Sequence, residues 1–152
     1  MSEIALRTAV PADAAAIRDL TRAAYAKWVP LIGREPKPME VDYEAAVQAH
    51  RFDLLHVDGV LVALIETVDE GDQLLIDNVA VSPDHQGQGL GRRLLAHAES
   101  LATDLGYGRI RLDTNKRFED NVALYLRLGY RIDREAPIVD GFVVHMSKRV
   151  TG

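Results

Sequence analysis

A strand that leads into a glycine-rich turn and then into a long amphipathic helix constrains this chain more than any other feature. The segment reads Val-Ala-Val-Ser-Pro-Asp-His-Gln-Gly-Gln-Gly-Leu-Gly from Val79 to Gly91. Gly87, Gly89 and Gly91 remove side chains where the chain must curl tightly, so that backbone N–H groups converge at the start of a helix near Leu90. This geometry is typical of an anion site, most naturally one for a phosphate or pyrophosphate.

Length and composition narrow the class of protein. With 152 residues, 47% of them hydrophobic, the chain can bury one core, so we expect a single domain over residues 1–152. No run approaches the roughly 18 apolar residues of a membrane span, and the first residues lack the features of a signal peptide. We therefore expect a cytoplasmic protein with no membrane partner. The net charge of −5 argues against a nucleic-acid partner.

Metal and thiol chemistry are also constrained by composition. The chain has no cysteine, which excludes disulfides, thiolate metal sites and a thiol nucleophile. Its histidines show no spacing typical of metal ligands, so we expect no metal.

The hydrophobic pattern predicts the element order β-α-α-β-β-β-α-β-α-β-β. Apolar residues alternate with polar ones in the strands and recur every three or four positions in the helices. We therefore expect an α/β (α+β) fold with a mixed sheet and helices on both faces. The predicted strands cover residues 4–6, 52–57, 60–67, 74–81, 110–113, 130–133 and 142–146, and the predicted helices cover 11–28, 42–50, 90–105 and 119–128.

Three local features complete this outline. The segment 30–38 holds three prolines and a glycine, which predicts an ordered surface loop. The pair Asp58-Gly59 predicts a two-residue hairpin turn. The segment 74–81 is nearly continuous apolar sequence, which predicts a strand buried on both faces.

The glycine-rich turn by itself is compatible with several phosphorylated ligands, and also with no ligand at all. A Walker phosphate loop requires Gly-Lys followed by Ser or Thr, whereas this helix starts Gly91-Arg92-Arg93. A dinucleotide fingerprint requires different glycine spacing and stands early in its fold, whereas this turn follows three predicted strands. A glycine-rich connection that binds nothing is the remaining plain interpretation.

Two motifs carry a more specific resemblance. The run Gln86-Gly87-Gln88-Gly89-Leu90-Gly91 fits the pattern Gln/Arg-x-x-Gly-x-Gly/Ala, and Ala-Leu-Tyr-Leu-Arg-Leu-Gly-Tyr follows from Ala123 to Tyr130. In these motifs and in element order, the chain resembles the GNAT superfamily of N-acetyltransferases over nearly its whole length. The resemblance implies a mostly antiparallel sheet of six to seven strands and acetyl-coenzyme A (acetyl-CoA) as co-substrate.

The resemblance also implies which residues bind the donor. The glycine turn would hold the pyrophosphate, and the strand before it would pair with the amides of the pantetheine arm. Such a helix N-terminus and strand edge suit these groups chemically. Many family members carry an asparagine seven residues before the motif tyrosine, where this chain has Phe118, so Asn121 is favoured as a substitute over Asn115. The donor residues are then Val79, Ala80, Val81, Gln86, Gly87, Gln88, Gly89, Leu90, Gly91, Arg92, Asn115 and Asn121.

Tyr125 is the predicted general acid. A phenol with a pKa near 10 can donate to a departing thiolate whose thiol has a pKa near 8.5. The plain alternative is a half-buried packing tyrosine. Two carboxylates are candidate bases: Asp77, expected to share a strand face with Val79 and Val81, and Glu66 on the preceding strand. Some members of the family use no dedicated base.

The acceptor is expected to lie against the first helix and the proline-rich segment. The candidate residues there are Tyr25, Trp28, Arg34, Glu35 and Met39, and His145 could approach from the last strand. An arginine could clamp a carboxylate or phosphate of the acceptor, and acidic residues could attract its amine.

These features together predict an N-acetyltransferase acting on a primary amine of a small molecule or peptide by direct attack in a ternary complex. A non-catalytic acyl-CoA binding or sensing module is the main alternative, and a plain nucleotide-binding domain is a remote one. A homodimer is a further expectation, because dimers are common in families that this chain resembles.

Overall fold

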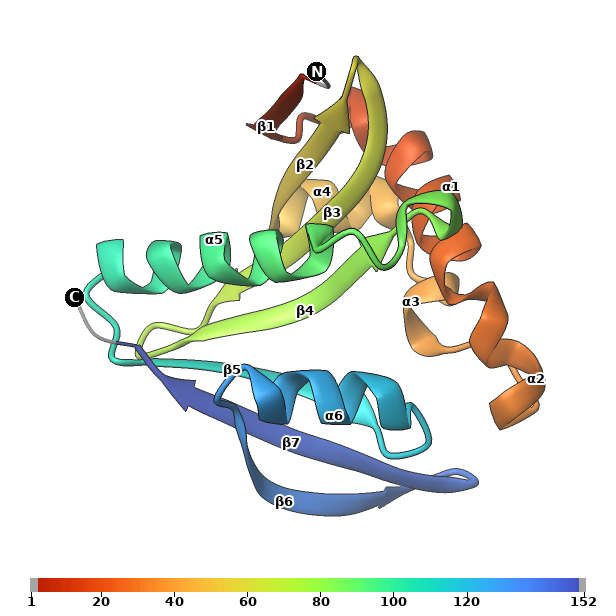
Figure 1. Ribbon diagram of the computed structural model, residues 1–152, viewed down its shortest axis with the longest axis vertical. Coiled ribbons are helices and arrows are strands. Elements are labelled where there is room, and N and C mark those ends of the chain that lie inside the picture. Colours follow the sequence, from red (N-terminus) through yellow and green to blue (C-terminus); the bar gives the residue numbers. More distant parts are fainter. Residues whose placement is uncertain (1–2, 151–152) are drawn as a thin grey trace.

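The computed structural model describes residues 3–150, which form a seven-stranded sheet with helices on both faces (Figure 1). The strand order is β1-β2-β3-β4-β5-β7-β6, and each neighbouring pair is antiparallel except β4 with β5. The strands are β1 Ile4–Thr8, β2 Arg51–Val57, β3 Val60–Asp69, β4 Leu74–Val81, β5 Arg109–Asn115, β6 Arg131–Ile138 and β7 Gly141–Arg149. The helices are α1 Ala14–Tyr25, α2 Val29–Ile32, α3 Lys37–Glu40, α4 Tyr43–Ala49, α5 Leu90–Asp104 and α6 Glu119–Arg127. This architecture confirms the predicted fold class. None of the described helices is long and apolar enough to span a membrane.

The proline-rich segment differs from the prediction. The expected loop over 30–38 contains most of α2 and the start of α3. Pro30 and Pro38 each occupy the second position of their helix, where the missing N–H would have had no partner within the helix. Gly33 ends α2 with a φ of 75°, and its N–H donates to the Val29 carbonyl at 2.9 Å. Proline therefore starts these short helices rather than preventing them.

Two apolar cores lie on opposite faces of the sheet. On one face α5 buries Leu94, Leu95 and Ala98 against the strands. On the other, α1 and α4 bury Ile17 and Tyr43 with the inward residues of β2 and β3. Because each helix presents one apolar stripe, the sheet is covered from both sides.

The two central strands separate partway along their length. β4 and β5 pair in parallel only through Leu74–Ile76 and Ile110–Leu112, and the remainder of each strand has no pairing with the other in the described chain. Figure 1 shows the two strands diverging from this point. The divergence exposes an edge of β4 in the middle of the sheet, between the helices.

A register shift between β3 and β4 decides where Asp77 points. Glu66 pairs with Asn78 and Thr67 with Ile76, so that Asp77 has no partner on β3. Such a bulge re-aims side chains. Asn78 bonds to Thr21 of α1 and Asp77 lies beside Glu66, so both point to the α1 and α4 side.

The predicted common face of Asp77 with Val79 and Val81 is therefore wrong, since the two valines pack on the α5 side. The prediction that β4 is buried on both faces is also only half right. Buried residues alternate along β4 with half-buried or exposed ones, because the diverging sheet leaves one side open.

Candidate active site

Two adjoining cavities occupy the opening between β4 and β5. The large cavity has a volume of about 690 Å³ and lies beside α2, α3 and the outer part of β7. The glycine-turn cavity has a volume of about 510 Å³ and lies between the start of α5 and α6. Four residues line both cavities: Tyr25, Val79, Asn121 and Tyr125. Two molecules bound in the two cavities would therefore meet at these four side chains.

Backbone conformation explains two of the glycines in the turn. Gly87 and Gly89 have φ values of 82° and 80°, in the left-handed region that glycine tolerates best. A Cβ at either position would meet nothing within 4 Å, so the conformation rather than lack of space favours glycine there. Gly91 has no such φ, and its Cβ would stand 3.9 Å from Val81.

The start of α5 fits an anion. Its N-cap is Gly89, which has no side chain to bond the free N–H groups of the first turn, and this turn holds no acidic residue. Arg92 adds a positive charge at the cavity wall. Unfilled backbone donors, the helix dipole and a guanidinium all favour a phosphate-like group here.

A second cation, Lys27, reaches the turn from the segment after α1. Its ammonium donates to Gln86 Oε1 at 3.0 Å, and Gln86 Nε2 donates to the Val81 carbonyl at 3.1 Å. His85 also lines this cavity, with a buried Nδ1 that has no partner among the described residues. Lys27 and His85 were not predicted from the sequence. Lys27 comes near the turn only because α1 packs against it, and no local pattern distinguishes His85.

Tyr25 ties α1 to the exposed edge of β4. Its hydroxyl donates to Asn78 Oδ1 at 2.8 Å and also contacts the Val79 carbonyl at 3.2 Å. Asn78 in turn donates to Thr21 Oγ1 at 3.3 Å and to the Tyr43 hydroxyl at 3.4 Å. This buried network holds the wall shared by the two cavities in one geometry.

Tyr125 stands on α6 where the two cavities join. It is half-buried, and burial raises the pKa of its phenol to about 12. Its hydroxyl makes no hydrogen bond to any described residue, so it is available to a ligand. The ring packs edge-on against Tyr130, with 5.8 Å between ring centroids.

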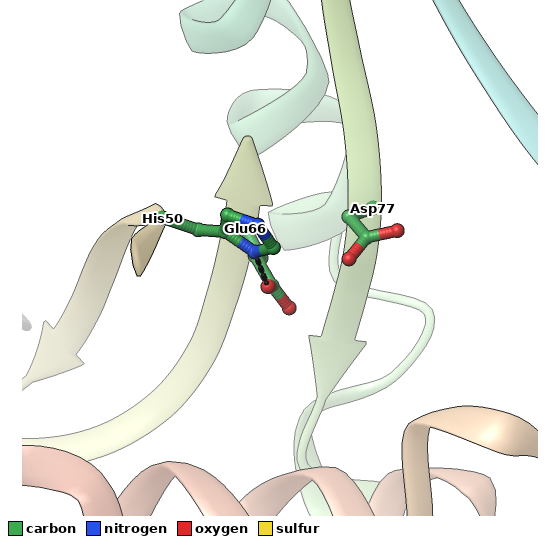
Figure 2. Close-up of side chains that lie close together, drawn as sticks. All are labelled: His50, Glu66 and Asp77. Atoms are coloured by element: carbon green, nitrogen blue, oxygen red, sulfur yellow. Dashed lines mark hydrogen bonds and ion pairs between the residues drawn. The ribbon is translucent and has the colours of Figure 1, made fainter. Parts of the chain in front are cut away.

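Two carboxylates and a histidine cluster behind the large cavity, as Figure 2 shows. Asp77 lines the cavity, whereas Glu66 is 3% exposed behind it and His50 is 32% exposed beyond that. His50 Nδ1 and Glu66 Oε2 are 2.6 Å apart, and one ligand atom from each of the three groups lies within 4.8 Å of the others. Burial, together with the nearby charge of Asp77, raises the pKa of Glu66 to about 7 against the opposing effect of His50.

The same three groups could in principle ligate a divalent metal. Two ligands each about 2.0 Å from a tetrahedral zinc ion lie about 3.3 Å apart. The 2.6 Å separation of His50 and Glu66 is instead that of a charge-assisted hydrogen bond. His50 and Glu66 as folded therefore have the geometry of a hydrogen-bonded pair.

The opposite wall of the large cavity carries a second acid and histidine pair. Asp113 Oδ1 and His145 Nδ1 are 2.6 Å apart, and Arg111 lies 3.3 Å from the same carboxylate. Arg34 contributes a cation from the segment between α2 and α3. The large cavity is therefore lined by both acidic and basic side chains, within walls that are largely apolar.

The structure gathers most of the predicted site residues and leaves some apart. Around the glycine-turn cavity lie Val79, Val81, Gln86, Gly87, Gly89, Leu90, Gly91, Arg92 and Asn121. Around the large cavity lie Tyr25, Arg34, Asp77, Asn115, Asn121, Tyr125 and His145. Trp28 lines the glycine-turn cavity instead of the large one, and Asn115 lines only the large one.

Besides Glu66, which is buried behind the large cavity, four predicted residues line neither cavity. Ala80 is buried in the core on the α1 side, and Gln88 is exposed. Glu35 pairs with Arg22 at 2.8 Å, and Met39 is buried. An amphipathic pattern places residues on a face, but the contacts of a loop or of a helix end depend on the packing around them.

Comparison with known proteins identifies the family. The model of the acetyltransferase (GNAT) family matches residues 15–130, and the chain belongs to this family. Its fold is shared by a solved N-acetyltransferase from Thermoplasma acidophilum, PaiA, in complex with coenzyme A, with a TM-score of 0.79 and 15% identity over 97% of this chain and 99% of that one.

Two curated relatives are similar over shorter stretches. The [ribosomal protein bS18]-alanine N-acetyltransferase of Escherichia coli K12 is 34% identical over 73 residues, which are 48% of this chain and 49% of that protein. The streptothricin acetyltransferase of Streptomyces lavendulae is 33% identical over 58 residues, which are 38% of this chain and 31% of that protein. The matches span less than half the length of these relatives.

Proposed function

We propose that this chain transfers an acetyl group from acetyl-CoA to a primary amine of a small molecule or peptide, by direct attack within a ternary complex. One observation carries the proposal: two cavities, one built for an anion and one with carboxylates, share a wall at Tyr125 and Val79. Direct attack requires both substrates to be present together with their reacting atoms at one point. The chain also has no cysteine to form an acetyl-enzyme.

The glycine-turn cavity is the proposed donor site. The free N–H groups at the start of α5, with Arg92 and Lys27, would bind the pyrophosphate. The free edge of β4 beside Val79 and Val81 would pair with the amides of the pantetheine arm as an added strand. Asn121 lines both cavities and could bond the same arm near the thioester. The coenzyme A complex of the Thermoplasma protein supports this assignment for a chain of the same fold.

Tyr125 is the proposed acid. Its raised pKa keeps the phenol protonated throughout the neutral range. Full transfer from a phenol with a pKa of about 12 to a thiolate is uphill, since the pKa of a thiol is near 8.5. The contribution of Tyr125 is therefore a hydrogen bond that stabilises the negative charge developing on the sulfur.

Asp77 is the proposed acceptor of the ammonium proton. It lines the large cavity, whereas Glu66 is buried behind it and can act only through Asp77 or a water molecule. The amine must lose a proton before its lone pair can attack the thioester. A carboxylate in the cavity wall also attracts the cationic form of the amine.

The large cavity is the proposed acceptor site. Arg34 can pair with a carboxylate or phosphate of the acceptor, while Asp77 and Asp113 favour its amine. The two curated relatives are named for an alanine of a ribosomal protein and for streptothricin, which agrees with an acceptor of either size.

A thiol-release assay tests this function directly. The protein is incubated with acetyl-CoA and a panel of amines that includes amino acids, polyamines and peptides with free N-termini. Release of coenzyme A that depends on one amine supports the transferase. Binding of acetyl-CoA by calorimetry with no release across the panel would instead support a non-catalytic acyl-CoA sensor of the same fold. Binding of NAD or ATP without coenzyme A binding would contradict both.

A further inference from the structure

A cluster of three ionisable groups reaches from the large cavity to the protein surface near the end of α4. Asp77 forms part of the cavity wall, Glu66 is buried next to it, and His50 bonds to Glu66 from the C-cap of α4. Exposure rises from 3% at Glu66 to 32% at His50. In Figure 2 the His50 side chain extends to Glu66 from one side of the view, and Asp77 lies on the other side.

Resting on the function proposed above, we propose that His50 is a proton-relay residue, which receives through Glu66 the proton that Asp77 takes from the amine and passes it to solvent. His50 itself does not touch the acceptor. It acts through Glu66 and is therefore a positioning residue for the acid and base chemistry of the cavity.

Glu66 has two ionisable neighbours in the cluster, Asp77 on the cavity side and His50 on the α4 side. On the β2 side its paired residue is Phe52, which is buried and apolar. From β4 it faces Asp77, and from α4 it faces His50 and the Tyr43 hydroxyl. Tyr43 donates its hydrogen to the Pro38 carbonyl at 2.6 Å, and burial raises the pKa of its phenol. His50 bonds to Glu66 and is partly exposed outside both cavities, whereas Asp77 is exposed on the side of the large cavity, where the acceptor would bind.

The proton that leaves the ammonium can reach solvent without any further reactant. The N–H bond of the ammonium breaks as an O–H bond forms on Asp77, and the proton then moves to Glu66 across a gap of at most 4.8 Å, directly or through one water. Glu66 passes it to His50 Nδ1 over 2.6 Å, and the ring releases its Nε2 proton to solvent. The ring returns to its first tautomer by exchange with solvent. Because the pKa of Glu66 is about 7, it can gain and lose this proton near neutral pH.

Two substitutions of His50 distinguish proton transfer by this residue from a purely structural role. His50→Asn places an amide nitrogen near the position of Nδ1, so it keeps a donor to Glu66 but cannot pass a proton on. His50→Ala removes both functions. His56→Asn, on β2 and outside the cluster, is the matched control. The readout is kcat/KM for an active amine against pH, in a dilute buffer and again with added imidazole.

We expect His50→Asn to lose about tenfold in kcat/KM near pH 7 and to regain most of it with imidazole, with no change in acetyl-CoA affinity. His56→Asn should match wild type.

Wild-type rates and pH dependence for His50→Asn would overturn the relay. The relay would also be overturned if both His50 variants lost kcat/KM equally and imidazole did not restore it, because that result indicates a structural role. Loss of wild-type activity on chelation and its recovery with zinc would also overturn it in favour of a metal. Wild type inactive with every amine would instead contradict the proposed function.

Discussion

Tyr125 and Tyr130 pack edge to face, with ring centroids 5.8 Å apart and an angle of 61° between the rings, yet their hydroxyl groups have opposite surroundings. Tyr125 lines both cavities. The Tyr130 hydroxyl is buried with no partner among the described residues. Two adjacent phenols therefore provide a test and its control.

Tyr125→Phe should lower kcat by about 10²-fold, because it removes the donor to the developing thiolate. Its affinity for acetyl-CoA by calorimetry should change little. Since the pKa of Tyr125 is about 12, the group stays protonated and the loss should be the same across the neutral pH range. Tyr130→Phe should keep full kcat and stability. A Tyr125→Phe enzyme with wild-type kcat at every pH would exclude Tyr125 as the acid.

Gly91→Asp should weaken acetyl-CoA binding without unfolding the turn. Gly91 has no left-handed φ, and a Cβ there makes only an ordinary contact with Val81. The new carboxylate would stand at the second position of α5, where it suits the helix dipole but repels a pyrophosphate. We expect the Kd to rise at least about tenfold, an effect of about 1.4 kcal/mol.

Gly89→Ala is the comparison for that experiment. It adds no charge but strains a backbone with φ near 80°, so it should lower the melting temperature as well as the affinity. A folded Gly91→Asp protein with unchanged affinity would show that the pyrophosphate binds elsewhere.

Glu66→Gln should stabilise the fold at alkaline pH and not at acid pH. Burial raises the pKa of Glu66 from 4.5 to about 7, so above pH 4.5 the unfolded chain loses its proton before the folded one does. Stability from this group is thus full below pH 4.5 and falls as the pH rises through 7. Glutamine resembles the neutral acid and does not titrate, so the variant avoids that loss.

Melting temperatures across this pH range measure the effect. We expect Glu66→Gln to gain roughly 2 kcal/mol, or about 5 °C, over wild type above pH 8, and the gain to vanish near pH 4.5. Phe52→Leu, the apolar residue paired with Glu66, should shift stability equally at all pH values. A pH-independent difference for Glu66→Gln would mean that the carboxyl is not held neutral in the fold.

Trp28 and Phe118 join the segment between α1 and α2 to the start of α6. Their rings stack with centroids 4.4 Å apart and an angle of 20° between the planes. A double-mutant cycle with Trp28→Ala and Phe118→Ala should give a coupling energy of about 1 kcal/mol in the free energy of unfolding. Because Trp28 also lines the glycine-turn cavity, Trp28→Ala should weaken acetyl-CoA binding more than Phe118→Ala does. Additive effects on stability would show that the stack contributes nothing.

Local rules predicted most of the elements and most of the residues that line the glycine-turn cavity. Glycine-rich backbone, helix periodicity and the alternation of strands depend on neighbours in sequence, so the turn before α5 and the position of Tyr125 on α6 followed from them. The short helices α2 and α3 were missed because proline was treated as a breaker, although it is tolerated in the first turn of a helix.

The arrangement of Asp77, Glu66 and His50 could not be predicted in the same way. Period-two alternation put Asp77 on the face of Val79, but one unpaired residue in β4 moved it to the face of Glu66. His50 follows α4 and precedes β2, and no spacing in the sequence relates it to Glu66. Their hydrogen bond arises only from how α4 packs against the sheet.

The sequence by itself determined a glycine-rich turn before a helix, an amphipathic helix bearing Tyr125 and a family resemblance that the comparison confirms. These depend on backbone preferences and residue order, which are local. Only the tertiary structure decided that β4 and β5 part beyond Ile76, that two cavities meet at Tyr25 and Tyr125, and that Asp77 faces Glu66. The register of β4 on β3 and the divergence of β4 from β5 are set by packing between distant segments, so they cannot be predicted from a local sequence pattern.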